Sequence, residues 1–192
     1  TTGISRAQCQ AVWLGTATVR WADLAGAGTA PVAIYTRSDA AGAPETWAHY
    51  LGARQENLRG IGVYGDPGLV EAVRQDVNGI GFCNLNFAYD ADSGAPIEGI
   101  LTIPLDANDN GVADAAERVD DKAAAMRTIA AGVYPAPPAR PLYFVAKERV
   151  SNPAAAAFLR WALTHGQHLV APTGYIPLSG DQLAAALALL EP

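Results

Sequence analysis

The chain is poor in the residues that mark several common protein classes. Its 192 residues include two cysteines, Cys9 and Cys83. Two are too few for a disulfide framework or a zinc site, so we interpret them as buried thiols unless the fold brings them together to pair. No run of about 18 apolar residues occurs, so nothing in the sequence predicts a transmembrane helix. The three histidines form no cluster, and no nucleophile–base motif is present. These absences predict a protein that is not an enzyme.

Positive charge is also scarce. Lysine and arginine total 13 against 19 acidic residues, which gives a net charge of −6 and argues against a nucleic-acid partner. A small anion is not excluded, because a few local donors hold it rather than the field of the whole molecule. Half of the residues are apolar and 17% are charged, as in a folded globular protein.

Segments typical of strands and helices alternate along the chain. Short apolar runs bounded by glycine or proline predict strands, and capping residues before amphipathic stretches predict helices. Asp66 is interpreted as a helix cap, and Phe158 and Trp161 as the inward face of a later helix. Alternation of this kind predicts a layered α/β fold. The expected strands are residues 31–36, 61–64, 79–83, 97–105 and 141–146, and the expected helices are residues 6–14, 44–51, 66–76, 120–131, 153–164 and 181–190.

The turn at residues 37–43 is the first candidate site. It follows a predicted strand and opens a predicted helix, which is where α/β proteins commonly bind ligands. Unpaired main-chain N–H groups at a helix start favour an anion, and an arginine adds a fork-shaped cation. The alternative is an ordinary strand-to-helix turn with a surface Arg–Asp pair. The predicted anion-binding residues are Arg37, Ser38, Asp39, Ala41, Gly42, Ala43 and Thr46.

An oxygen-rich loop at residues 106–117 is the second candidate site. Its oxygen-bearing residues fall in the register of a 12-residue calcium loop, with Gly111 at the sharp turn. A strand rather than a helix is expected before it, which argues against a calcium-sensing EF-hand pair. The loop therefore predicts a structural Ca²⁺ site, with a turn that binds no metal as the alternative. The predicted ligands are Asp106, Asn108, Asn110, the Val112 carbonyl, Asp114 and Glu117.

Several motifs follow one another in order over essentially the whole chain. They are a Trp-x-Asp-Leu segment at residues 21–24, the Arg37 turn, a glycine-rich strand at residues 79–82, a Tyr-Pro-x-Pro-Pro-Ala-Arg-x-Leu-Tyr crossing at residues 134–143, and closing segments at residues 158–163 and 174–178. Together they resemble the periplasmic phosphate-binding proteins of ABC importers, and the turn at residues 37–43 lies where that family has its phosphate loop.

The resemblance implies a type II periplasmic-binding-protein-like fold with two α/β lobes and a hinge. Residues 1–138 would form the second lobe, with both candidate sites, and residues 139–192 would close an incomplete first lobe. The proline-rich stretch at residues 134–141 is stiff and is the expected hinge. The implied partners are phosphate or a related oxyanion, an ABC permease, and an N-terminal segment of the same protein that is absent here. The implied location is periplasmic or extracellular, with membrane anchoring through an absent segment as a further expectation.

Two features depart from the family pattern. Ala41 and Ala43 stand where the family has hydroxyl donors, and each lost donor to a charged ligand is worth about 1.5–3 kcal/mol. The chain also lacks the family's N-terminal segment. These departures leave an alternative open, in which the chain is a calcium-stabilised extracellular scaffold or interaction protein that keeps the fold and has lost the ligand.

Overall fold

The computed structural model describes residues 2–26 and 28–191 as a mixed α/β chain. It divides after Arg140 into two compact units. The elements of the first unit are β1 (Ile4–Ser5), α1 (Arg6–Trp13), α2 (Trp21–Ala25), β2 (Ala33–Arg37), α3 (Gly42–Tyr50), η1 (Gln55–Asn57), β3 (Ile61–Val63), α4 (Gly65–Gln75), β4 (Gly79–Ile80), α5 (Leu85–Ala88), β5 (Leu105–Asp106) and α6 (Lys122–Ala130). Those of the second unit are α7 (Pro153–Leu163), η2 (His165–Leu169) and α8 (Gly180–Ala188).

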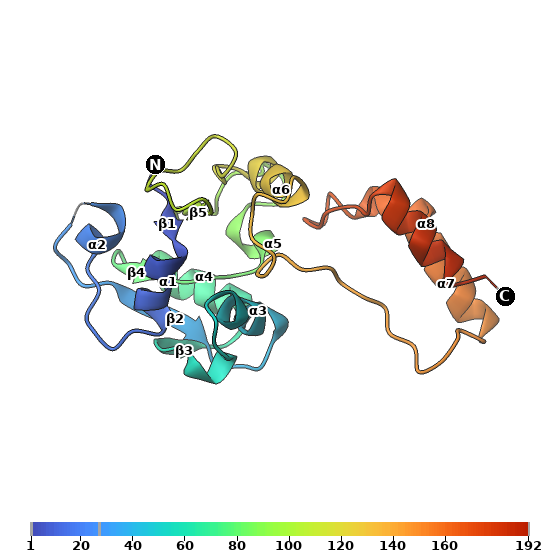
Figure 1. Cartoon of the computed structure of the whole chain (residues 1–192), viewed down its shortest axis with the longest axis horizontal. Helices are drawn as coiled ribbons and strands as arrows, with labels where there is room; N and C mark the ends of the chain where they lie inside the picture. The colour runs from blue at the N-terminus through green and yellow to red at the C-terminus, as the bar shows by residue number, and fades with distance from the viewer. Residues whose placement is uncertain (1, 27, 192) are drawn as a thin grey trace. The chain divides into compact units, whose positions relative to one another are not determined.

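Two small parallel sheets organise the first unit. The larger has the order β3-β2-β4, and in the smaller β1 pairs with β5, so that Ile4 lies opposite Leu105 (Figure 1). The central strand β2 places Arg37 at its carboxyl end, opposite Val63 of β3. Helix α3 follows β2, and α4 packs against the sheet. The alternation predicted from the sequence therefore forms, and it places the Arg37 turn at the carboxyl edge of the sheet.

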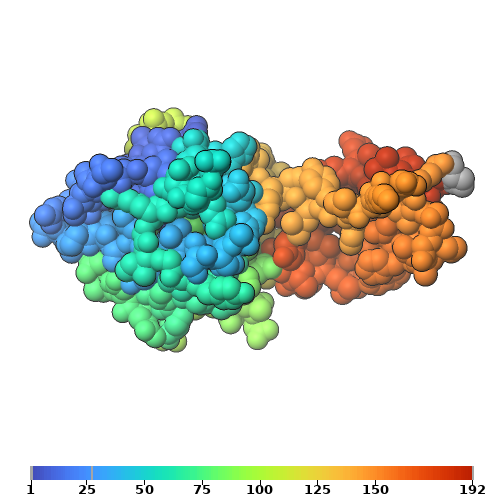
Figure 2. Space-filling model, turned by 90° about the horizontal axis from the view of Figure 1, so that it is seen from below, coloured from blue at the N-terminus to red at the C-terminus, as the bar shows by residue number. Residues whose placement is uncertain are grey.

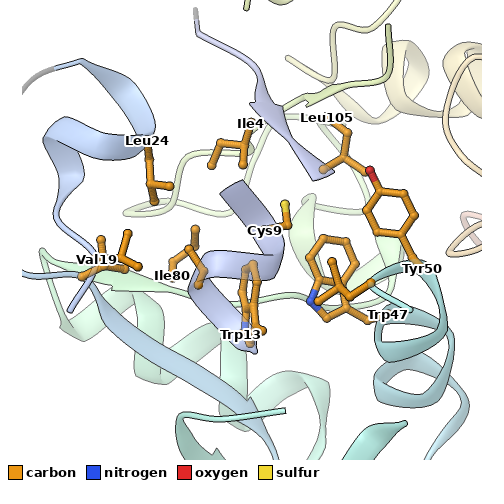
Figure 3. Packing of buried hydrophobic residues seen from close by; sticks show 12 residues of the cluster. Ile4, Cys9, Trp13, Val19, Leu24, Trp47, Tyr50, Ile80 and Leu105 are labelled. Carbon is orange, nitrogen blue, oxygen red and sulfur yellow. The ribbon is translucent and has the colours of Figure 1, made fainter. Parts of the chain in front are cut away.

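An aromatic cluster holds α1 and α3 together in the core. The rings of Trp13 and Trp47 meet edge to face at 5.1 Å, and Phe82 packs against both. Trp13 also donates from Nε1 to the Tyr35 carbonyl oxygen at 3.2 Å, which ties α1 to β2. Figure 3 shows Cys9 of α1 among these side chains. The helix that carries the candidate anion site is thus anchored by large buried aromatic surfaces.

Both cysteines are free thiols, as the sequence interpretation expected. Burial raises the pKa of Cys9 to about 12 and that of Cys83 to about 12. Thiols with pKa values this high are protonated at neutral pH and react slowly.

Two of the predicted strands are wrong. Of residues 97–105, only Leu105 is in a strand, and residues 141–146 form none. In the second segment Tyr143 and Val145 are exposed, with no neighbouring strand to accept their main-chain hydrogen bonds. Apolar, β-branched composition favours a strand only where a second strand is available to pair with it. Here that partner is lacking among the described residues.

The second unit is small and leaves apolar side chains exposed. Helices α7 and α8 pack against each other, and the ring of Phe158 stacks near that of Trp161. Figure 2 shows the atoms of this unit in orange to red. Both residues were predicted to face inward, yet they are 55% and 46% exposed. The prediction that these two side chains face inward is wrong for the second unit. Two helices and a short turn are too small to bury the apolar face of α7. Within the described ranges, no helix has the length and apolar character needed to cross a membrane.

Candidate functional site

The turn after β2 brings the predicted anion-binding residues to the first turn of α3. Ala41 is the N-cap, in an extended conformation, and its side chain offers no oxygen to cap the helix. Gly42 is exposed at the first helical position, and Ala43 follows it buried. Neither of their N–H groups has an acceptor in the part of the chain that the structure describes. The helix start therefore presents free donors and the positive end of the helix dipole.

Arg37 is buried and paired with two carboxylates. Its Nε and Nη2 donate to Asp39 Oδ1 and Oδ2 at 2.8 and 2.5 Å. Its Nη1 lies 2.8 Å from Asp66 Oδ1, as an ion pair rather than a well-aligned hydrogen bond. The Arg37 side chain is only 5% exposed, so the alternative of a surface Arg–Asp pair does not describe it.

Asp66 is a partner of Arg37 that sequence reasoning missed. It was interpreted as the cap of a helix, but α4 begins at Gly65 with Tyr64 as its N-cap. The Asp66 carboxylate instead accepts hydrogen bonds from the Asn84 main-chain N at 3.2 Å and from Asn84 Nδ2 at 2.8 Å. No local pattern signals this role, because 29 residues separate Asp66 from Arg37 in the sequence.

The ion pairs perturb the titration of the groups involved. The hydrogen bonds from Arg37, followed by that from the Gly65 N–H, lower the pKa of Asp39 well below its ordinary value. The hydrogen bond to Asp39 raises the pKa of Arg37. A carboxyl group whose folded pKa is lowered stabilises the fold above its unfolded pKa of about 4 and loses that contribution as the pH falls. The Arg37–Asp39 pair is therefore formed throughout the neutral range.

Thr46 is occupied by contacts within its own unit. Its Oγ1 donates towards the Gly42 and Ala43 carbonyl oxygens, at 2.8 and 3.1 Å, and accepts from Arg140 Nη1 at 3.0 Å. Its proton is thus used on its own helix. The structure places Ser38 on the surface beside Gly62. All seven predicted residues therefore surround one turn, and Arg140, which sequence reasoning did not assign, joins them from 94 residues away.

The start of α3 is open rather than enclosed. A hollow of about 550 Å³ lies at the other end of the helix, lined by Arg6, Gln10, Tyr50, Asp106 and Asp109 among others. A nine-residue helix is roughly 13 Å long, so this hollow does not include the Gly42 end. The start of α3 is therefore not part of this hollow, and Gly42 lies exposed on the surface of the first unit.

The loop at residues 106–117 holds itself together with its own side chains. The Asp106 carboxylate accepts from the N–H groups of Asn110 and Gly111, at 3.1 and 2.8 Å. The Glu117 carboxylate accepts from the N–H groups of Ala107 and Asp114, at 2.8 and 3.0 Å. Positive φ angles at Asp109 and Gly111 make the sharp turn. The two-residue strand β5 leads into the loop, whereas the longer strand predicted at residues 97–105 does not form.

The remaining predicted calcium ligands lie on the exposed side of this loop. Asp114 Oδ2 accepts from the side-chain amides of Asn108 and Asn110, at 2.7 and 2.9 Å, and Val112 is 53% exposed. Among the residues that the structure describes, no group of three or more His, Cys, Asp or Glu side chains is arranged to hold a metal ion. The calcium site stays a prediction from the sequence.

Comparison with known proteins relates the chain to solute-binding proteins. The family model described as a PBP superfamily domain matches residues 2–165, in agreement with the resemblance seen in the motifs. A Clostridium perfringens protein, assigned as a phosphate ABC transporter substrate-binding protein and solved with bound phosphate, superposes with a TM-score of 0.68 at 19% identity. A Planctomyces limnophilus protein assigned as phosphate-binding gives a TM-score of 0.50 at 16% identity. No curated protein matches at a significant level.

These structures are longer than the chain. The alignments cover 92% and 98% of this chain but 63% of each matched protein. At such low identity the likeness establishes the fold and not the ligand.

Proposed function

The chain belongs to the PBP superfamily, and we propose that it is part of a solute-binding protein that captures phosphate or a closely related oxyanion for an ABC importer. The observation that carries the proposal is the start of α3, where the Gly42 and Ala43 N–H groups have no acceptor among the described residues and Arg140 lies beside Gly42. The first unit would be one lobe of the binding cleft, and the second unit would belong to the other. A periplasmic or extracellular location and an ABC permease partner follow from the same proposal.

The exposed apolar surface of the second unit supports this arrangement. Tyr143 and Val145 are exposed in the segment that was predicted to form a strand. Phe158 is exposed on the face of α7 that was predicted to be buried. Segments of this kind need a sheet to join. The part of the matched proteins that the chain does not cover is long enough to supply one, and to provide the opposite wall of an anion site.

Phosphate is expected to stabilise the natural protein, expressed in full, against thermal unfolding. A ligand at about 100 times its dissociation constant adds about 2.7 kcal/mol, which is several degrees for a chain of this size. Thermal shift measures this, with sulfate and chloride at matched ionic strength as controls. A rise with phosphate alone supports phosphate, and a rise with sulfate alone assigns a different oxyanion. No rise with any anion at millimolar concentration would remove the proposed function.

A second candidate function is a calcium-stabilised scaffold that keeps the fold without the ligand. The two carboxylates on Arg37 favour it, because they already balance that cation. The methyl side chains of Ala41 and Ala43 favour it too, since they leave the helix start without hydroxyl donors. A measurement of anion binding separates the two candidate functions, because a scaffold that has lost the ligand is expected not to bind phosphate.

The calcium hypothesis predicts that millimolar Ca²⁺ raises the melting temperature and that a chelator lowers it, while Mg²⁺ does little. Calcium at ten times its dissociation constant adds about 1.4 kcal/mol. Asp106→Asn should abolish the dependence by removing a ligand charge. Asp109→Asn is the matched control, because Asp109 lies in the same loop outside the predicted ligand set and Asn tolerates its positive φ. Equal melting curves with calcium and with chelator would show that the loop is only a turn.

A further inference from the structure

Arg37 does not supply a surplus positive charge at the start of α3. It is enclosed with Asp39 and Asp66, so the buried group carries one positive and two negative charges. An oxyanion placed beside this group gains from the Arg37 donors but also meets two carboxylates. A site that binds a multiply charged anion there needs a further cation.

Arg140 is positioned to be that cation. Its Nη1 donates to Thr46 Oγ1 at 3.0 Å, and its guanidinium lies next to Gly42. A Cβ atom added at Gly42 would be 2.5 Å from Arg140 Nη2 and 3.0 Å from Cζ, so a larger residue at position 42 would displace the guanidinium from this place. The hydrogen bond to Thr46 and the space at Gly42 therefore place Arg140 beside the first helical residue of α3.

A cation in this position is electrostatically unfavourable without an anion. The start of a helix carries a partial positive charge, and a second positive charge beside it raises the energy of the folded state. Arg140 is exposed and has no carboxylate partner within the described ranges, unlike Arg54, which pairs with Glu56. Glu45, in the first turn of α3, pairs with no arginine there either. Free N–H groups and a guanidinium without a carboxylate partner among the described residues thus lie next to each other at the start of α3.

We propose that Arg140 is an anion-contacting residue of this site and stands in for the hydroxyl donors missing at Ala41 and Ala43. The inference rests on the proposed function, since it assigns a ligand to the same turn. A guanidinium offers two parallel N–H donors, which match two oxygens of a tetrahedral anion such as phosphate. Its charge also offsets the excess of carboxylate around Arg37. The ligand class is accordingly a tetrahedral oxyanion with at least two unsubstituted oxygens.

The test is a titration of the natural protein and its variants with inorganic phosphate by isothermal calorimetry. Arg140→Gln should weaken phosphate binding about 10- to 100-fold, the range for one lost charged hydrogen-bonding group. Arg140→Lys should retain more affinity than Arg140→Gln, because the charge remains and the fork is lost. Arg54→Gln is the matched control, since it removes the same charge from another exposed site of the first unit, and it should bind as the parent does.

The outcomes separate this inference from the proposed function. If the parent protein binds no phosphate, the proposed function fails, and the role of Arg140 fails with it. If the parent binds phosphate and Arg140→Gln binds as tightly as Arg54→Gln, the proposed function stands and the role of Arg140 is overturned. A selective loss of phosphate affinity in Arg140→Gln, with a thermal stability in the absence of phosphate that is not below that of the parent, supports a direct contact.

Discussion

Replacing Arg37 with methionine is expected to lower the free energy of unfolding by about 3–5 kcal/mol, the cost of removing one partner from a buried ion pair. The variant keeps the length of the side chain and leaves the Asp39 and Asp66 carboxylates without their common cation. Urea unfolding at neutral pH measures the change. The melting temperature should fall by roughly 6–20 °C for a chain of this size.

Arg118→Met is the matched control for this variant. Arg118 pairs with Asp120 at 2.6 Å, two residues along the chain, as Arg37 pairs with Asp39. Its side chain is 46% exposed rather than 5%, and exposed pairs are worth about 0–1 kcal/mol. The two variants should therefore differ by several kcal/mol. Equal, small losses would show that Arg37 is not a structural cation and is free to serve a ligand alone.

The pH dependence of the free energy of unfolding of the Arg37 variant is a second test of the Arg37–Asp39 ion pair. The pKa of Asp39 is lowered by Arg37, so the parent loses this stabilisation as the pH falls below about 4. In the variant, protonation of the carboxyls relieves their repulsion in the same range. The difference in stability between parent and variant should shrink in acid. A difference that grows as the pH falls would contradict this account.

Replacing Trp47 with alanine should cost about 3–5 kcal/mol, as for other large aromatic residues removed from a core. The Trp47 ring packs against Trp13, Tyr50 and Phe82, and the residue is only 6% exposed. Its loss would also loosen α3, which carries Gly42 and Thr46. Urea unfolding followed by circular dichroism measures the stability without relying on the altered tryptophan signal. A loss under about 1 kcal/mol would mean that the cluster is not the anchor of α3.

Phenylalanine substitutions distinguish the two central indoles. Trp47 Nε1 is buried without an acceptor among the described residues, so Trp47→Phe removes an unsatisfied donor and should cost less than about 1.5 kcal/mol. Trp13 Nε1 donates to the Tyr35 carbonyl oxygen, so Trp13→Phe removes a partly buried hydrogen bond as well as ring volume and should cost about 1–3 kcal/mol. A reversed order would show that packing volume, and not hydrogen bonding, dominates at both positions.

The sequence by itself determined the features that depend on neighbouring residues. Local patterns predicted the strand at residues 31–36, the helix that begins at Gly42, and the resemblance to periplasmic binding proteins. Apolar runs and helix-start residues act over a few positions, so they need no knowledge of the fold. The placement of a candidate anion site between β2 and α3 follows from the same local order.

Only the tertiary structure decided which distant residues share that site. Asp66 reaches Arg37 because α4 packs on β2, and Arg140 reaches Thr46 because the chain returns to α3 after 94 residues. The strand predicted at residues 141–146 also depended on a distant partner. Its composition favours pairing, but the described residues include no strand that pairs with it. Contacts between remote segments depend on how elements pack, and no pattern within a short stretch of sequence encodes that packing.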